Sequence, residues 1–303
     1  VLPSSALTSA RGLAAFVRWA WAALAFGFLL AFSSAVGQSY FIGLFGAQIR
    51  ADLGLSHGEL GAIYAAATVA SAGTFLFAGK LADRLSPRSA SLVTAAWLIG
   101  ATVLMAFAAH PVTLLIALFA LRLGGQGMMS HIALTTLGRW FSAERGRAVA
   151  LATLGFPSAE AVLPPLVALG LVHLGAAPVW LIAAATLALV VAPALAALSG
   201  LAERARERRS ARRVDDGAGT PDVYSWTRAQ VLRDPRFYAV APSLLAPPFI
   251  ITGIVFHQAR LVEANGWTLP QFAAQGLENA ALLGGLHPLG HGPQPQMPGQ
   301  QND

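Results

Sequence analysis

The 303-residue sequence has few charged residues and no cysteine. Only 11% of its residues are Asp, Glu, Lys or Arg, whereas soluble domains carry about 25%. An ordinary soluble enzyme is therefore excluded, because so few charged side chains cannot cover a water-facing surface. The absence of cysteine excludes disulfides, thiolate nucleophiles and cysteine-ligated metals.

Long stretches without any charge fill most of the chain. They cover residues 19–49, 60–79, 89–121, 161–202 and 237–259. Each stretch reaches or exceeds the roughly 20 residues that an α-helix needs to cross the hydrocarbon core of a bilayer. The sequence therefore predicts an all-α membrane protein with several spans.

Apolar runs and the residues that interrupt them predict seven membrane-spanning helices. The predicted spans are 19–45, 57–79, 89–109, 112–137, 148–174, 178–199 and 237–259. Ser56 and Glu59 have the spacing of a capping box at the start of the second span. His110 and Pro111 separate the third span from the fourth.

Basic residues fall almost entirely on one side of the membrane when the N-terminus is placed in the cytoplasm. Of the 20 Lys and Arg residues, 17 then face the cytoplasm, Arg50 and Arg260 lie outside, and Arg122 lies within a span. This asymmetry follows the positive-inside rule. It predicts a multi-pass protein of a bacterial-type inner (plasma) membrane and explains the net charge of +6 without a nucleic-acid partner.

The predicted organisation has five parts. They are a cytoplasmic N-terminus (1–18), a six-span bundle (19–199), a basic cytoplasmic loop (200–236), a seventh span (237–264), and an outer loop with a tail (265–303). The loop carries nine of the arginines and is interpreted as a solvated, partly helical linker rather than a lipid-binding patch. The tail is rich in Gly, Pro and Gln, a composition typical of disorder.

Three motifs carry a resemblance to a known family. The segment Gly79–Arg88, GKLADRLSPR, resembles the signature loop of the major facilitator superfamily (MFS) between spans two and three, with Ser86 and Pro87 departing from it. The segment 139–148 is similar to the family's loop between spans four and five. Arg122-Leu-Gly-Gly-Gln-Gly is similar to its Arg-x-x-Gln-Gly motif in span four, with Gln126 displaced by one position.

The resemblance implies an MFS-type bundle and a secondary active transporter that works by alternating access. It also implies that the two loops hold the halves of the transporter together on the cytoplasmic side, through Gly79, Asp83, Arg84, Arg88, Arg145 and Arg147. The alternative is that these charges only fix the topology. Family members have twelve spans in two halves, and this sequence supplies one half and a seventh span.

A truncated or frameshifted gene is the expected reason for that shortfall. The alternative function is therefore a non-transporting membrane remnant, or a subunit that needs a partner chain. If the polypeptide works as written, we expect it to form a dimer or to pair with another chain.

Two charges within the predicted spans are the leading candidates for a site. By helix rise, Arg122 lies about 15 Å and Glu160 about 21 Å from the outer face, so an ion pair or a water-bridged pair between them is expected. The functional interpretation makes Arg122 an anion-binding or coupling residue and Glu160 a proton-titrating or substrate-binding one. The alternative is a structural pair. Further candidates for the cavity wall are Gln38, Tyr40, Gln126 and His131, each of which could instead form a helix–helix hydrogen bond.

An intramembrane arginine favours a small organic anion as the solute, with protons as the coupling ion. No cofactor and no metal are expected. An ATP-driven pump is excluded, because Gly73 to Lys80 lacks the spacing of a phosphate loop. An intramembrane enzyme is not expected either, since His131, Glu160 and His173 form no metal site or nucleophile–base pair.

Overall fold

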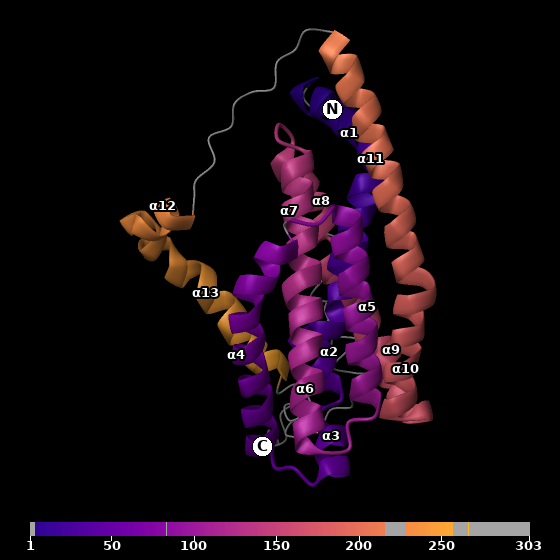
Figure 1. Ribbon diagram of the computed structural model, residues 1–303, viewed down its shortest axis with the longest axis vertical. Helices are drawn as coiled ribbons and strands as arrows, with labels where there is room; N and C mark the ends of the chain where they lie inside the picture. Colours follow the sequence, from indigo (N-terminus) through magenta and orange to yellow (C-terminus); the bar gives the residue numbers. More distant parts are fainter. Residues whose placement is uncertain (1–3, 83, 216–227, 257–265, 267–303) are drawn as a thin grey trace, which may run out of the picture.

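The computed structural model describes residues 4–82, 84–215, 228–256 and 266, and every regular element in these ranges is a helix (Figure 1). In chain order the elements are α1 (Ser4–Ser33), η1 (Ser34–Gly37), α2 (Ser39–Leu44), α3 (Gly46–Leu53), α4 (His57–Ala82), α5 (Pro87–Ala106), α6 (Pro111–Leu121), η2 (Arg122–Met129), α7 (Ser130–Trp140), α8 (Arg145–Thr153), α9 (Gly155–Leu174), α10 (Ala176–Thr186), η3 (Leu187–Val191), α11 (Ala192–Asp215), α12 (Arg228–Arg233) and α13 (Pro235–Phe256). The all-α prediction is confirmed.

Six segments of the described chain are helical, long and apolar enough to cross a membrane. They are Gly12–Leu44, His57–Lys80, Pro87–Ala106, Pro111–Trp140, Arg145–Leu174 and Ala176–Arg208. Each contains most of one of the first six predicted spans. The predicted seventh span coincides with α13, which packs on α2 but is not one of these six. Its membrane crossing stays a prediction.

The start of α4 forms as its capping signal predicts, and the start of α6 is capped by His110, a residue predicted only to separate two spans. The backbone N–H of Ser56 donates to Glu59 Oε2 at 2.8 Å, and the N–H of Glu59 donates to Ser56 Oγ at 3.2 Å. At the start of α6, His110 Nδ1 accepts from the N–H of Val112 at 3.2 Å. These bonds satisfy N–H groups that a helix terminus otherwise leaves without a partner.

The first span is interrupted in a way that the sequence pattern does not predict. Helix α1 ends at Ser33, the 3₁₀ turn η1 follows, and Gln38 is extended (φ −83°, ψ 152°) before α2 begins. The interruption lies where η1 packs on η2, the π-helical turn of the fourth span. A Cβ added at Gly125 would lie 2.6 Å from Gly37 Cα, so the two backbones touch only because both residues are glycine.

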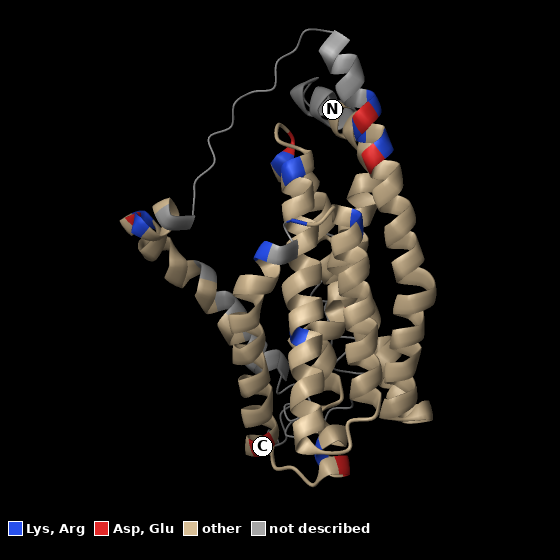
Figure 2. Ribbon diagram, viewed as in Figure 1, with Lys and Arg blue, Asp and Glu red and all other residues tan. Residues whose placement is uncertain are grey.

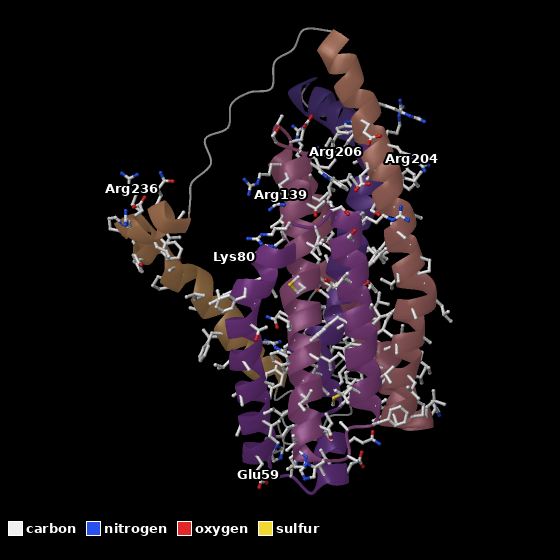
Figure 3. The ribbon with its side chains drawn as sticks, viewed as in Figure 1. Glu59, Lys80, Arg139, Arg204, Arg206 and Arg236 are labelled. Atoms are coloured by element: carbon white, nitrogen blue, oxygen red, sulfur yellow. The ribbon has the colours of Figure 1, made fainter. Side chains whose placement is uncertain are left out.

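The spanning helices form one elongated bundle, and its charges lie mainly at the ends (Figures 1 and 2). Helix α11 continues the sixth span along α1 and projects beyond the rest of the bundle at the end where α1 begins. Lys80, Arg139, Arg204 and Arg206 lie toward that same end, and Glu59 lies at the opposite end (Figure 3). The predicted clustering of cations on one side of the bundle is thus present in the described residues.

The basic loop predicted over 200–236 is helical for much of its described length. Helix α11 extends through its first part to Asp215, and α12 follows after residues 216–227, which lie outside the described residues. The Arg206 guanidinium lies over the Trp140 ring, 5.2 Å from its centroid. This cation–π contact joins α11 to the end of the fourth span. The predicted outer loop and tail also lie outside the described residues, except for Gly266.

Candidate functional site

A cavity of about 380 Å³ lies between the first, fourth and fifth spans. Four of the candidate residues line it, namely Gln38, Tyr40, Gln126 and Glu160. The rest of its wall is made by Ala31, Ser34, Ala35, Ser130 and Phe156. We call this space the polar cavity, because five hydrogen-bonding side chains and one carboxyl group line it.

Two walls of the polar cavity depend on local departures from regular helix, and the third depends on a close approach between two helices. Gln38 and Tyr40 reach it because the first span is interrupted between η1 and α2. Gln126 lies in η2, and π-helical turns are frequent at functional sites. On the third wall, α9 approaches α1 closely at Gly155, where a Cβ would lie 2.8 Å from Ala31 Cβ and would clash with the Phe28 carbonyl.

Arg122 lies behind the polar cavity and is not part of its wall. Its side chain is only 6% exposed. Nη1 donates to Ser39 Oγ at 3.1 Å and to the Gly37 carbonyl at 3.4 Å. The guanidinium also lies over the Tyr64 ring, 5.2 Å from its centroid, and the Tyr64 hydroxyl donates to Ser39 Oγ at 2.7 Å.

These contacts give Arg122 a clear structural effect. The interruption of the first span removes regular helical hydrogen bonding around Gly37, and backbone polar groups inside a membrane must be satisfied by the protein. Arg122 supplies a charged donor to that carbonyl and binds the first residue of α2. It therefore joins the fourth span to both sides of the interruption.

A direct ion pair between Arg122 and Glu160 is absent from the described residues, and the water-bridged alternative stays a prediction. No salt bridge joins these two residues in the described part of the chain, and Arg122 donates hydrogen bonds to Gly37 and Ser39 instead. Counting residues along a helix gives the height of a side chain in the membrane. It does not give the direction in which the side chain points from the helix axis. Arg122 points toward α2 and α4, whereas Glu160 lines the polar cavity from α9.

Sequence reasoning missed Ser39 and Tyr64. Both are buried, and both bond within this network. In the sequence, each appears only as a polar residue inside an apolar run. Many residues that serve helix packing alone have the same appearance.

His131 lies apart from the polar cavity. Its ring packs edge-on against Phe75 with centroids 5.4 Å apart, and its side chain lines a separate small pocket with Thr135 and Arg139. Leu85 and Pro87 line the same pocket, so His131 lies beside the loop that follows α4. His131 does not line the polar cavity with Gln38 and Gln126, and its role in a solute pathway stays a prediction.

The residues of the two predicted gating loops are placed in part. Gly79 is buried near the end of α4, and Arg84, Arg88, Arg145 and Arg147 are exposed. Asp83 lies outside the described residues. Arg145 extends over Gly138, where an added Cβ would lie 3.2 Å from its Nε. Figure 3 shows Lys80 and Arg139, one from each loop region, toward the same end of the bundle.

Comparison with known protein families decides between the classes of protein that the fold allows. A family model described as Major Facilitator Superfamily matches residues 27–290. The chain belongs to the Major Facilitator Superfamily. The resemblance carried by the sequence motifs is confirmed, and the chain is a secondary transporter of the major facilitator type. As an MFS protein with several apolar helices, it is a multi-pass protein of a lipid bilayer. No curated protein matches the chain.

Proposed function

We propose that this MFS chain moves a small solute by alternating access and binds that solute in the polar cavity. The observation that supports the proposal is the convergence of Gln38, Tyr40, Gln126 and Glu160, from three different spans, on one space of about 380 Å³. Polar side chains at membrane depth are costly and commonly mark solute pathways. A cavity of this size is also within the range of small-molecule sites.

In this proposal, Arg122 is a positioning residue and not a solute ligand. Its Nη1 is engaged by Gly37 and Ser39, and its side chain does not line the polar cavity. It holds the interrupted segment that presents Gln38 and Tyr40. Glu160 is the group that binds the solute or a coupling proton, because it is charged and exposed to the cavity.

The loop residues complete the proposed cycle on the cytoplasmic side. Gly79 lies near the end of the second span, Arg84 and Arg88 follow that span, and Arg145 and Arg147 follow the fourth. We propose that these loops hold the closed state of that side, as the family motif implies, and that Asp83 takes part. Lys80 and Arg139, which border the two loops, lie toward the same end of the bundle (Figure 3), and this supports the role.

Single-cysteine labelling tests the proposal directly, because the natural chain contains no cysteine. The full chain carrying Gln126→Cys is placed in membrane vesicles of each orientation and treated with a membrane-impermeant maleimide. Alternating access gives labelling from both faces, since water reaches the cavity from each side in turn. Leu189→Cys is the control. Leu189 is 77% exposed on an apolar span, and a thiol facing lipid does not react.

Labelling of the Gln126→Cys variant from one face only would support the alternative of a non-transporting subunit. No labelling from either face would reject the polar cavity as a solute site. Solute uptake by the reconstituted full chain is the companion measurement, and the Glu160→Gln substitution should reduce the rate of that uptake.

A further inference from the structure

We infer that the polar cavity selects small organic cations, with an ammonium group held by Glu160. This inference rests on the proposed function, because it names the class of solute that the proposed site takes. It differs from the expectation of an organic anion, which depended on Arg122 facing the solute.

The charge of the cavity wall is the first argument. Among the described residues that line the cavity, Glu160 is the only charged one. Arg122 forms no salt bridge with it, because the buried Arg122 directs Nη1 to Gly37 and Ser39 and places its guanidinium over Tyr64. A carboxylate without a cation at membrane depth is costly. A cationic solute supplies the missing charge, whereas an anionic solute meets repulsion.

The aromatic side chains of the wall are the second argument. Phe156 precedes Glu160 by four residues on α9, so the two share one face of the helix. Tyr40 lines the same cavity from α2. An ammonium group beside Glu160 would therefore have aromatic rings nearby, and cation–π attraction favours cations over isosteric neutral groups.

The neutral polar groups are the third argument. Ser130 Oγ is buried, lines the cavity and has no hydrogen-bond partner in the described part of the chain. Gln126 lies four residues earlier and is exposed to the cavity. Their oxygens can accept hydrogen bonds from a polar substituent of the solute. The wall thus offers one anion, two aromatic rings and neutral acceptors, a set that fits a small organic cation carrying a hydroxyl group.

The size of the space separates a solute site from a proton site. A proton relay needs only the carboxyl group and a few waters, whereas this cavity measures about 380 Å³. That volume accommodates a solute with several non-hydrogen atoms.

A matched set of probes tests the inference. The probes are choline, its neutral isostere 3,3-dimethyl-1-butanol and the anion 3,3-dimethylbutyrate; in the last two, a tert-butyl group of the same shape replaces the trimethylammonium group. Binding to the full chain in nanodiscs of zwitterionic lipid is measured by isothermal titration calorimetry. We expect choline to bind more tightly than either isostere. Glu160→Gln should weaken choline binding about tenfold or more. A tenfold change corresponds to about 1.4 kcal/mol, and one charge pair in a partly desolvated site contributes more than this.

Glu59→Gln is the matched control, because it removes a carboxylate at the far end of α4 and should leave choline binding unchanged. Choline should also slow maleimide labelling of the Gln126→Cys variant.

Equal binding of choline and its neutral isostere, preference for the anion, or unchanged affinity in Glu160→Gln would overturn the inference. If the Gln126→Cys variant labels from both faces while choline fails to bind, the cation preference is rejected and the transporter proposal stands. If that variant labels from neither face, both are rejected.

Discussion

Arg122 Nη1 donates a hydrogen bond to Ser39 Oγ at 3.1 Å, and this bond joins the middle of the fourth span to the residue that restarts the first span. The same nitrogen donates to the carbonyl of Gly37, on the other side of the interruption. The charge that the sequence marks as most unusual in this protein therefore organises the backbone. The cavity wall is a consequence of that organisation.

The first prediction concerns Arg122 itself. Arg122→Gln should lower the thermal stability of the detergent-solubilised chain, because hydrogen bonds to charged groups contribute about 1.5–3 kcal/mol each. Arg122→Lys should recover part of the loss, since an ammonium can still donate to Ser39 or Gly37 but lacks the planar guanidinium over Tyr64. Thermal unfolding followed by circular dichroism measures both. Arg147→Gln, at an exposed position, is the control. Equal stability of all three variants would contradict this role.

The second prediction concerns the hydrogen bond between Tyr64 and Ser39. Tyr64→Phe keeps the ring under Arg122 and removes the hydroxyl that donates to Ser39 Oγ at 2.7 Å. We expect a loss of about 1 kcal/mol in unfolding free energy. The effects of Tyr64→Phe and Ser39→Ala should be less than additive, because both remove the same bond. A double-mutant cycle on urea or thermal unfolding measures this, and strict additivity would show that the two residues act independently.

The third prediction concerns the glycine contact between the first and fourth spans. Gly125→Ala should sharply reduce the yield of folded chain, because its Cβ would lie 2.6 Å from Gly37 Cα and backbone cannot move aside as a side chain can. Overpacking of this kind costs about 1–3 kcal/mol or more.

Gly100→Ala is the matched control for that contact. Gly100 lies within α5 and has no heavy atom within 4 Å of the added Cβ. Size-exclusion profiles of both variants, expressed in parallel, provide the measurement. A normal profile for Gly125→Ala would mean that the two spans can separate without loss.

The fourth prediction concerns the orientation of the bundle. Arg88→Cys and Arg145→Cys should label from the same face of the membrane, which we expect to be cytoplasmic, because cations gather at that end of the bundle. Glu59→Cys should label from the opposite face. Inside-out and right-side-out vesicles treated with an impermeant maleimide give the answer. Labelling of Arg88→Cys and Arg145→Cys from opposite faces would reject the proposed topology.

The sequence by itself determined the class of the protein and most of its helices. Charge-free runs of membrane length predict a bundle of membrane-spanning helices. Local signals such as the Ser56–Glu59 capping box fix helix starts, because they act over three or four residues. It also identified Gln38, Tyr40, Gln126 and Glu160 as cavity candidates, since polar groups are rare within such runs.

Only the tertiary structure decided which of those polar side chains lie together. It separated His131 from the cavity, turned Arg122 away from Glu160 and toward Ser39, and revealed the interruption after Ser33. The physical reason is that sequence spacing gives the height of a residue along its own helix. The partner that a side chain meets depends on how closely neighbouring backbones approach, and here the paired glycines Gly37 and Gly125 set that approach.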